Sequence, residues 1–143
     1  MNLAAILWAY LKEHPIGAVF AAPFDVVFSD FDVVEPDVLY ISRERAGVLT
    51  EKHMRGAPDL VVEILSAGTR KTDEVTKRRL YERSGVNEYW VVDPELDAIK
   101  IYRRVEGTFA RVAELAAEAG DTLTTPLLPG FAVSLPAVFA SPI

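Results

Sequence analysis

Residues 58–66 read Pro-Asp-Leu-Val-Val-Glu-Ile-Leu-Ser, and the architecture that we expect follows from them. The segment from Asp59 to Leu65 is almost continuously apolar and rich in β-branched side chains, apart from the carboxylate of Glu63. Strands of this composition are buried on both faces, which requires a covering layer on each side of the sheet. The segment therefore predicts a buried strand of an α/β (α+β) domain.

The sequence on either side of this strand predicts the remaining elements. Downstream, residues 72–84 are expected to form a helix that Thr72 or Thr69 caps and that Gly85 ends. Upstream, residues 43–57 are polar, contain two glycines and predict a long loop. The other expected elements are a helix at 3–12, strands at 18–22, 25–28, 33–42, 87–92, 98–103 and 109–115, and a tail of short pieces at 127–139.

Glu63 is the first anomaly in this pattern, because it interrupts a strand that otherwise reads as fully buried. Burying an isolated carboxylate is costly, so such a group is protonated, paired with a cation or bound to a metal. Two explanations stay open from the sequence. Glu63 is either a metal ligand or one half of a salt bridge with a nearby arginine or lysine.

Asp37 is the second anomaly, since it follows Pro36 and opens the buried stretch that ends at Ser42. Asp59 occupies a similar position, but it lies four residues from Glu63, roughly 13 Å along a strand, which is too far to share one metal. If the strands before and after the 43–57 loop pair antiparallel, Asp37 lies opposite the region from Glu63 to Leu65. Asp37 and Glu63 are therefore the better pair, and Asp59 is expected to cap or line the loop.

The helix at 72–84 supplies a candidate lysine. Asp73, Lys77 and Tyr81 recur at a spacing of four residues, which places them on one stripe that we expect to face the sheet, with Arg78 and Arg79 on the outer face. An inward lysine can hold a nucleophile or transition-state charge. A surface ion pair between Asp73 and Lys77 is the alternative.

Two carboxylates that leave positions for water suit Mg²⁺ or Mn²⁺. A cation of this kind activates water and stabilises charge that develops on a phosphate. The chain has no cysteine, so oxygen or imidazole groups must hold any metal.

Size and charge narrow the class of protein. The 143 residues predict one domain, 1–143, and no apolar run approaches the roughly 20 residues that cross a bilayer. Without a convincing signal peptide, we expect a cytoplasmic protein. The net charge of −6 argues against simple nonspecific binding of nucleic acid, but residues 43–56 and 70–83 are basic and flank the candidate site. Solvated loop and helix faces are the alternative explanation for both basic segments.

Several of these segments together are similar to a known family. They are PDVLYIS at 36–42, PDLVVEILS at 58–66, TRKTDEVTKRRLYERSGVNEYWVVDP at 69–94 and TLTTPLLPGFAVSL at 122–135. Their order and spacing resemble the Uma2-like (DUF820) restriction endonuclease family of the PD-(D/E)XK nuclease superfamily. The resemblance covers residues 18–139, and the block at 58–94 is its most specific part.

The resemblance implies a restriction-endonuclease-like fold, in which helices flank a mixed β-sheet, and a Mg²⁺-dependent phosphodiesterase site. It assigns Asp37 as the metal-binding aspartate and Glu63 as the second acid. In the wider superfamily a lysine usually follows two residues after this acid, where this chain has Leu65. The resemblance therefore implies Lys77 as a lysine displaced to the helix.

Asp73 and Tyr81 match the helix pattern of the family, and we treat them with Asp59 as possible supporting residues. Relative to the family, the domain is expected to be short at its N-terminus, with Glu13 as the only acid in the first helix.

Three functions stay open at this point. The first is a metal-dependent endonuclease that hydrolyses DNA, expected to act as a homodimer whose interface includes Tyr89, Trp90 and the tail. The second is a catalytically inactive relative that binds nucleic acid or a protein. The third is a β-rich module for a small ligand, with Glu63 in a buried ion pair.

Overall fold

The computed structural model describes residues 1–50, 53–66 and 70–141, without the side chains of residues 70–73. A six-stranded sheet runs through the molecule in the order β1-β4-β6-β7-β8-β9. Strands β6 and β7 are parallel and all other neighbours in this sheet are antiparallel, so the sheet is mixed, as predicted. Its strands are β1 (Gly17–Ala21), β4 (Val38–Ser42), β6 (Leu60–Ile64), β7 (Glu88–Asp93), β8 (Ala98–Val105) and β9 (Thr108–Ala116).

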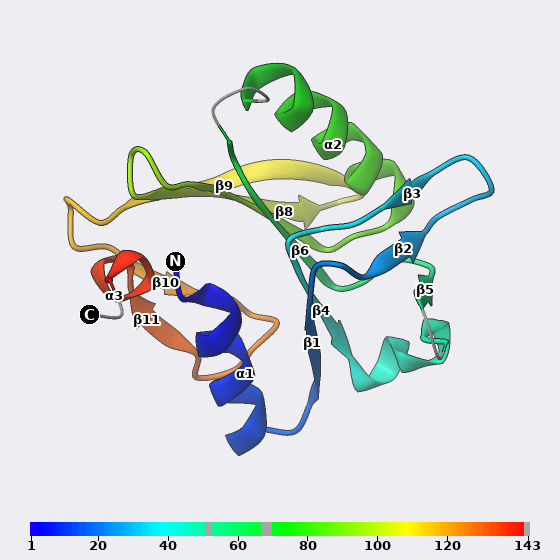
Figure 1. The fold of residues 1–143 in the computed structure, drawn as a ribbon, viewed down its shortest axis with the longest axis horizontal. Coiled ribbons are helices and arrows are strands. Elements are labelled where there is room, and N and C mark those ends of the chain that lie inside the picture. The colour runs from blue at the N-terminus through cyan, green and yellow to red at the C-terminus, as the bar shows by residue number, and fades with distance from the viewer. Residues whose placement is uncertain (51–52, 67–69, 142–143) are drawn as a thin grey trace.

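Two layers cover this sheet. Helix α2 (Arg70–Ser84) lies on one face (Figure 1). The other face is covered by four elements, which are α1 (Leu3–Glu13), α3 (Leu135–Phe139), β10 (Thr122–Thr124) and β11 (Ala132–Ser134).

The alternation of side chains along β6 explains its composition. Leu60 and Val62 pack in the cluster that includes α1, whereas Val61 packs with Tyr81 of α2. The prediction that this strand is buried on both faces is therefore confirmed. Because Glu63 has the same parity as Val61, its side chain points toward α2.

A second, smaller sheet contains β3 (Val33–Val34), β2 (Asp25–Val27) and β5 (His53–Arg55) in that order. The prediction of one strand over 33–42 was wrong, because the chain leaves the small sheet after β3 and enters the large sheet only at Val38. Pro36, which lacks a backbone N–H, lies in the break.

The prediction of a loop over 43–57 was also wrong. This segment contains the 3₁₀ helix η1 (Arg43–Val48) and β5, which pairs parallel with β2. Short elements of this kind carry too little periodicity to be read from sequence, and the partner of β5 is distant in the chain.

The other predicted elements are confirmed with small shifts of their ends. Helix α2 begins at Arg70, so the proposed cap Thr69 lies outside the described residues, and so does the side chain of Thr72. Strands β7 and β8 form the expected antiparallel hairpin. None of the helices among the described residues has the length and apolar character needed to span a bilayer.

The first and last helices lie beside each other. The backbone N–H of Asn2 donates to the carbonyl of Val138 at 2.9 Å, and the Asn2 side chain donates to the carbonyls of Ala137 and Ala140. Leu3 and Leu7 of α1 are completely buried in the same cluster as Val138. The helix at the start of the chain thus depends on the last described segment for part of its packing.

Candidate functional site

The candidate site lies where β4 begins and β6 ends. The predicted antiparallel pairing of these strands is confirmed, with Val38 opposite Val62. One step further along the ladder, Asp37 and Glu63 lie opposite each other. The pairing thus brings together the two carboxylates that the sequence singled out, from segments 26 residues apart.

Glu63 is 5% exposed and has two partners on α2. The hydroxyl of Tyr81 donates to Glu63 Oε2 at 2.6 Å, and Lys77 Nζ lies 3.1 Å from the same oxygen. Burial raises the pKa of the Glu63 carboxyl above its usual value, whereas Tyr81 and Lys77 lower it and the charge of Asp37 raises it further. Burial is the largest of these influences, so Glu63 is held with an unusually high affinity for a proton.

Tyr81 is completely buried against the rings of Tyr89 and Phe28. Burial raises the pKa of the Tyr81 hydroxyl, and the Glu63 carboxylate raises it further. This hydroxyl therefore remains a donor across the physiological range. It fixes the Glu63 side chain in one orientation.

Asp37 is held by the backbone of the neighbouring strand. The N–H of Ile64 donates to Asp37 Oδ2 at 2.7 Å, and the carbonyl of Asp37 accepts from the N–H of Ala22 at 3.0 Å. The other carboxylate oxygen of Asp37, and Oε1 of Glu63, make no hydrogen bond or ion pair within the described part of the chain. Each acid thus keeps one oxygen for a further ligand.

Lys77 lies on the side of α2 that faces the sheet, and 30% of its side chain is exposed. It therefore touches the buried carboxylate and also reaches solvent. Leu65, where the wider superfamily usually has lysine, is partly buried and packs with the apolar cluster under α2. Lys77 is the cation that contacts Glu63 in its place.

The other two possible supporting residues are Asp73 and Asp59. The side chain of Asp73 is outside the described residues, so its proposed pairing with Lys77 stays a prediction. Asp59 lies at the opposite end of β6, where it accepts from the N–H of Ser42 at 2.6 Å and pairs with Arg45 at 3.5 Å. The structure places Asp59 against the segment after β4, away from Asp37 and Glu63.

The residues at this site fit a small divalent cation. Two carboxylates, each with one oxygen not engaged by protein, are hard donors of the kind that Mg²⁺ and Mn²⁺ prefer. No group of three or more acidic, histidine or cysteine side chains suited to a metal occurs within residues 1–50, 53–66 and 74–141. A cation at this site would therefore keep several water ligands, as Mg²⁺ commonly does.

The fold and the family of this chain are both shared with known proteins. A mixed sheet flanked by helices is the architecture of a nuclease-like fold. The family model Uma2, described as "Putative restriction endonuclease", matches residues 1–137, so this chain belongs to the Uma2 family. The predicted family is thereby confirmed.

Two solved structures resemble the chain. A "putative nuclease belonging to DUF820" from Anabaena variabilis has a TM-score of 0.77 and 19% identity, over 96% of this chain and 76% of that one. The type IIG restriction endonuclease BpuSI has a TM-score of 0.51 and 12% identity, over 80% of this chain and 13% of that one. At these identities the likeness establishes the fold alone. No curated protein matched the chain.

Proposed function

We propose that this protein is a Mg²⁺-dependent (or Mn²⁺-dependent) endonuclease that hydrolyses phosphodiester bonds of DNA. The observation that carries the proposal is that Asp37, Glu63 and Lys77 come together where β4 begins and β6 ends. Two acids with available oxygens beside a partly exposed lysine supply what phosphoryl transfer needs, which is positioning and charge stabilisation. Membership of the Uma2 family supports the same reaction class.

In this proposal each residue has a separate role. Asp37 and Glu63 would hold the cation, which when bound lowers the pKa of a water ligand and offsets charge on the phosphate. The Ile64 N–H and the Tyr81 hydroxyl keep the two carboxylates in fixed orientations. Lys77 would donate a hydrogen bond to a non-bridging phosphate oxygen. Water adds to phosphorus and loses a proton to solvent, while the bond to the leaving oxygen breaks and that oxygen takes up a proton from solvent.

A catalytically inactive binding module is the second candidate function. It is favoured by the partners of Glu63, which is already satisfied at one oxygen by Lys77 and Tyr81 as in a structural ion pair. The presence of Leu65 at the usual lysine position also favours it. In that case the site would bind no cation, and any nucleic-acid or protein partner would bind without being cut.

Cation binding separates these two functions. We expect the wild-type protein to bind Mg²⁺ or Mn²⁺ saturably in isothermal titration calorimetry. Asp37→Ala and Glu63→Ala should lose that binding, because each removes one of the two acids proposed to hold the cation. Lys12→Ala is the matched control, since Lys12 is exposed on α1. Its titration should equal that of the wild type.

The alternative outcome is equally informative. Absence of cation binding by the wild-type protein, at concentrations where its circular dichroism shows a folded chain, would overturn the nuclease proposal. Glu63 would then be a structural partner of Lys77. Saturable binding, lost in both variants, would justify an assay of supercoiled plasmid cleavage with the same proteins.

We also propose that residues 1–143 act as one domain and that two copies pair when both strands of a duplex are cut. Closed two-fold pairs are the commonest protein oligomers. Tyr89 and Trp90, predicted to join the interface, are completely buried in the core and cannot contribute to it. Sedimentation equilibrium should give twice the 15.8 kDa chain mass at micromolar concentrations. A monomeric mass across that range, with and without DNA, would exclude the pair.

A further inference from the structure

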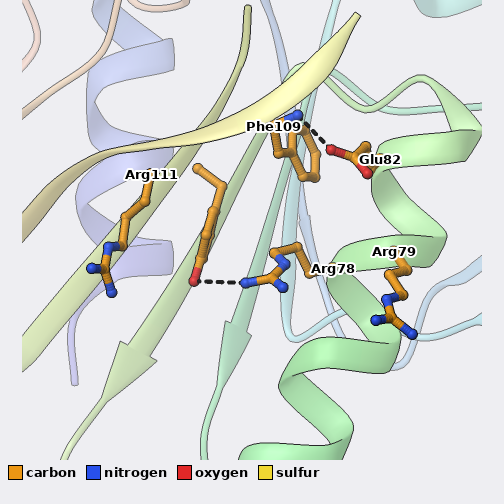
Figure 2. A pocket seen from close by; sticks show the side chains of 6 residues that line it. Arg78, Arg79, Glu82, Phe109 and Arg111 are labelled. Carbon is orange, nitrogen blue, oxygen red and sulfur yellow. Dashed lines mark hydrogen bonds between the residues drawn. The ribbon is translucent and has the colours of Figure 1, made fainter.

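A hollow lies between α2 and the outer strands β8 and β9, next to the candidate site but separate from it. Its volume is about 410 Å³. Figure 2 shows that α2 supplies one wall and the sheet the other, with Arg78 between them, Arg79 on α2 and Arg111 on the outer strand. The lining residues are Arg78, Arg79, Glu82, Tyr102, Phe109 and Arg111.

Arg78 is held against the sheet rather than on the outer face, so that prediction from the helix pattern was wrong. Its guanidinium lies 5.3 Å from the centre of the Tyr102 ring, and Nη1 donates to the Tyr102 hydroxyl at 3.3 Å. The planar guanidinium gains more from an aromatic ring than from water at this position. Its charge is therefore fixed at one wall of the hollow.

The positive charge in the hollow is largely uncompensated. Arg78 and Arg79 form no ion pair with any carboxylate among the described residues. Arg111 pairs with Glu114 at 3.8 Å, but more than half of both side chains is exposed, and such pairs contribute little. The guanidinium of Arg111 can leave Glu114 for a stronger anion at small cost.

Among the residues that the structure describes, Glu82 is the one carboxylate that lines the hollow, and it already makes hydrogen bonds to the sheet. Its Oε2 accepts from the N–H of Phe109 at 2.6 Å (Figure 2), and its carbonyl accepts from Arg104 at 2.6 Å. These bonds tie α2 to β8 and β9. The hollow therefore has three guanidinium groups against one carboxylate, with the carboxylate bound to backbone.

Guanidinium groups in this number recognise phosphate, which they bind through paired, charge-assisted hydrogen bonds. The aromatic floor is not available for base stacking, since Tyr102 is only 6% exposed and Arg78 covers its ring. The chemistry thus fits the sugar-phosphate backbone rather than the bases.

The sheet connects this hollow to the candidate site by direct pairing. Across β6, β7, β8 and β9, the row that starts at Val61 continues through Tyr89 and Tyr102 to Arg111. Glu63 begins the next row on the same face. Three strand spacings separate β6 from β9, or roughly 14 Å, which corresponds to about four nucleotides at the rise of one DNA strand.

We propose that Arg78, Arg79 and Arg111 bind the phosphate backbone of the DNA strand a few nucleotides from the phosphate that is cut. This proposal rests on the nuclease function for its substrate, but it assigns a separate contact surface. The three arginines would orient the strand and carry no part of the chemistry.

The test measures DNA binding without cleavage. A fluorescein-labelled 20-base-pair duplex is titrated in EDTA with Glu63→Gln protein, followed by anisotropy at several salt concentrations. In this background we add three substitutions together, which are Arg78→Gln, Arg79→Gln and Arg111→Gln. They should weaken DNA binding at least about 10-fold. They should also reduce the slope of log K against log salt concentration by about 2 to 3, because each phosphate contact contributes about 0.9 to that slope.

A matched triple variant separates local contacts from net charge. Lys12→Gln, Arg43→Gln and Arg55→Gln remove the same charge at exposed positions outside the hollow. This control should change the slope by less than half as much. Equal losses in the two triple variants, or an unchanged slope in the first, would overturn the proposal. Circular dichroism melting checks that each variant is folded.

Failure of the nuclease function can be distinguished from failure of this inference. Mg²⁺ titration calorimetry on the arginine triple variant with Glu63 intact reports on the acids alone and should match the wild type. Arginine-dependent DNA binding by a protein that binds no cation would leave the hollow as a backbone-binding surface and remove the nuclease. Cation-dependent cleavage, together with DNA binding that does not depend on the three arginines, would support the nuclease function and overturn the assignment of the hollow as a backbone-binding surface.

Discussion

Replacing Glu63 by Gln is expected to abolish cation-dependent DNA cleavage and, at the same time, to make the metal-free protein more stable at neutral pH. Cleavage should fall at least about 100-fold, since the variant loses one of two acids that would hold the cation and its catalytic water. Stability should rise on the order of 1 kcal/mol, because the neutral amide avoids the cost of holding an ionised carboxylate in a buried position. Lys77 is 30% exposed, so water can solvate its charge once the carboxylate is gone.

The raised pKa of Glu63 explains why Glu63→Gln is expected to be more stable than the wild-type protein. In the folded protein this carboxyl binds its proton more tightly than in the unfolded chain, chiefly because it is buried. As pH rises from the unfolded pKa through the folded pKa, the wild-type protein therefore loses stability. The variant lacks this titration. Its advantage should be present above the folded pKa of Glu63 and disappear as pH falls below the unfolded pKa.

Urea unfolding in EDTA, followed by circular dichroism at several pH values, measures this difference. Glu118→Gln, a substitution at an exposed acid, is the control and should leave both stability and cleavage unchanged. A Glu63→Gln protein that is less stable than wild type above pH 7 would mean that the ion pair with Lys77 outweighs the cost of burial. Full cleavage activity in this variant would remove Glu63 from the cation site.

Glu88→Ala is expected to have the largest effect on stability, about 3 to 5 kcal/mol. Glu88 is 1% exposed and accepts from the Trp90 indole at 3.0 Å and from the Thr125 hydroxyl at 2.6 Å. It also pairs with Arg103 at 3.4 Å. Alanine would leave all three groups without this partner, beside a cavity in the cluster that contains Trp90.

Glu88→Gln is the control that separates hydrogen bonding from charge. Glutamine can accept from Trp90 and donate to Thr125, while Arg103, 32% exposed, can be solvated. Its loss of stability should therefore be less than half that of Glu88→Ala, measured by urea unfolding. A loss below about 1 kcal/mol for Glu88→Ala would show that the network contributes little to the fold.

The elements that could be predicted from sequence were those with strong local patterns. The apolar run of β6 and the periodic helix α2 fixed the central strand, its covering layer and the sheet-facing position of Lys77. The pairing of Asp37 with Glu63 followed from one assumption about strand direction. The hydrogen bond from the Ile64 N–H to Asp37 was not predicted, because it depends on the exact register of β4 and β6.

The failures share a physical cause, which is competition from partners distant in the chain. Helix spacing alone placed Arg78 on the outer face, yet the ring and hydroxyl of Tyr102 hold it against the sheet. Strand β5 has three residues and exists because β2 lies alongside it. The sequence near these residues does not indicate such partners. A search for aromatic residues opposite basic ones could, however, have suggested the contact between Arg78 and Tyr102.

The hydrogen bond between Asn2 and Val138 joins segments that a ribosome makes at very different times, which affects when helix α1 can pack. A ribosome releases α1 before α3, yet Leu3 and Leu7 pack in a cluster completed by Leu135 and Val138, which are synthesised roughly 130 residues later. Until α3 emerges, the apolar face of α1 has no complete covering and is exposed to competing contacts. Helix α1 can therefore reach its native packing only after α3 has been made, whereas the strands that carry Asp37 and Glu63 and the helix that carries Lys77 can meet earlier.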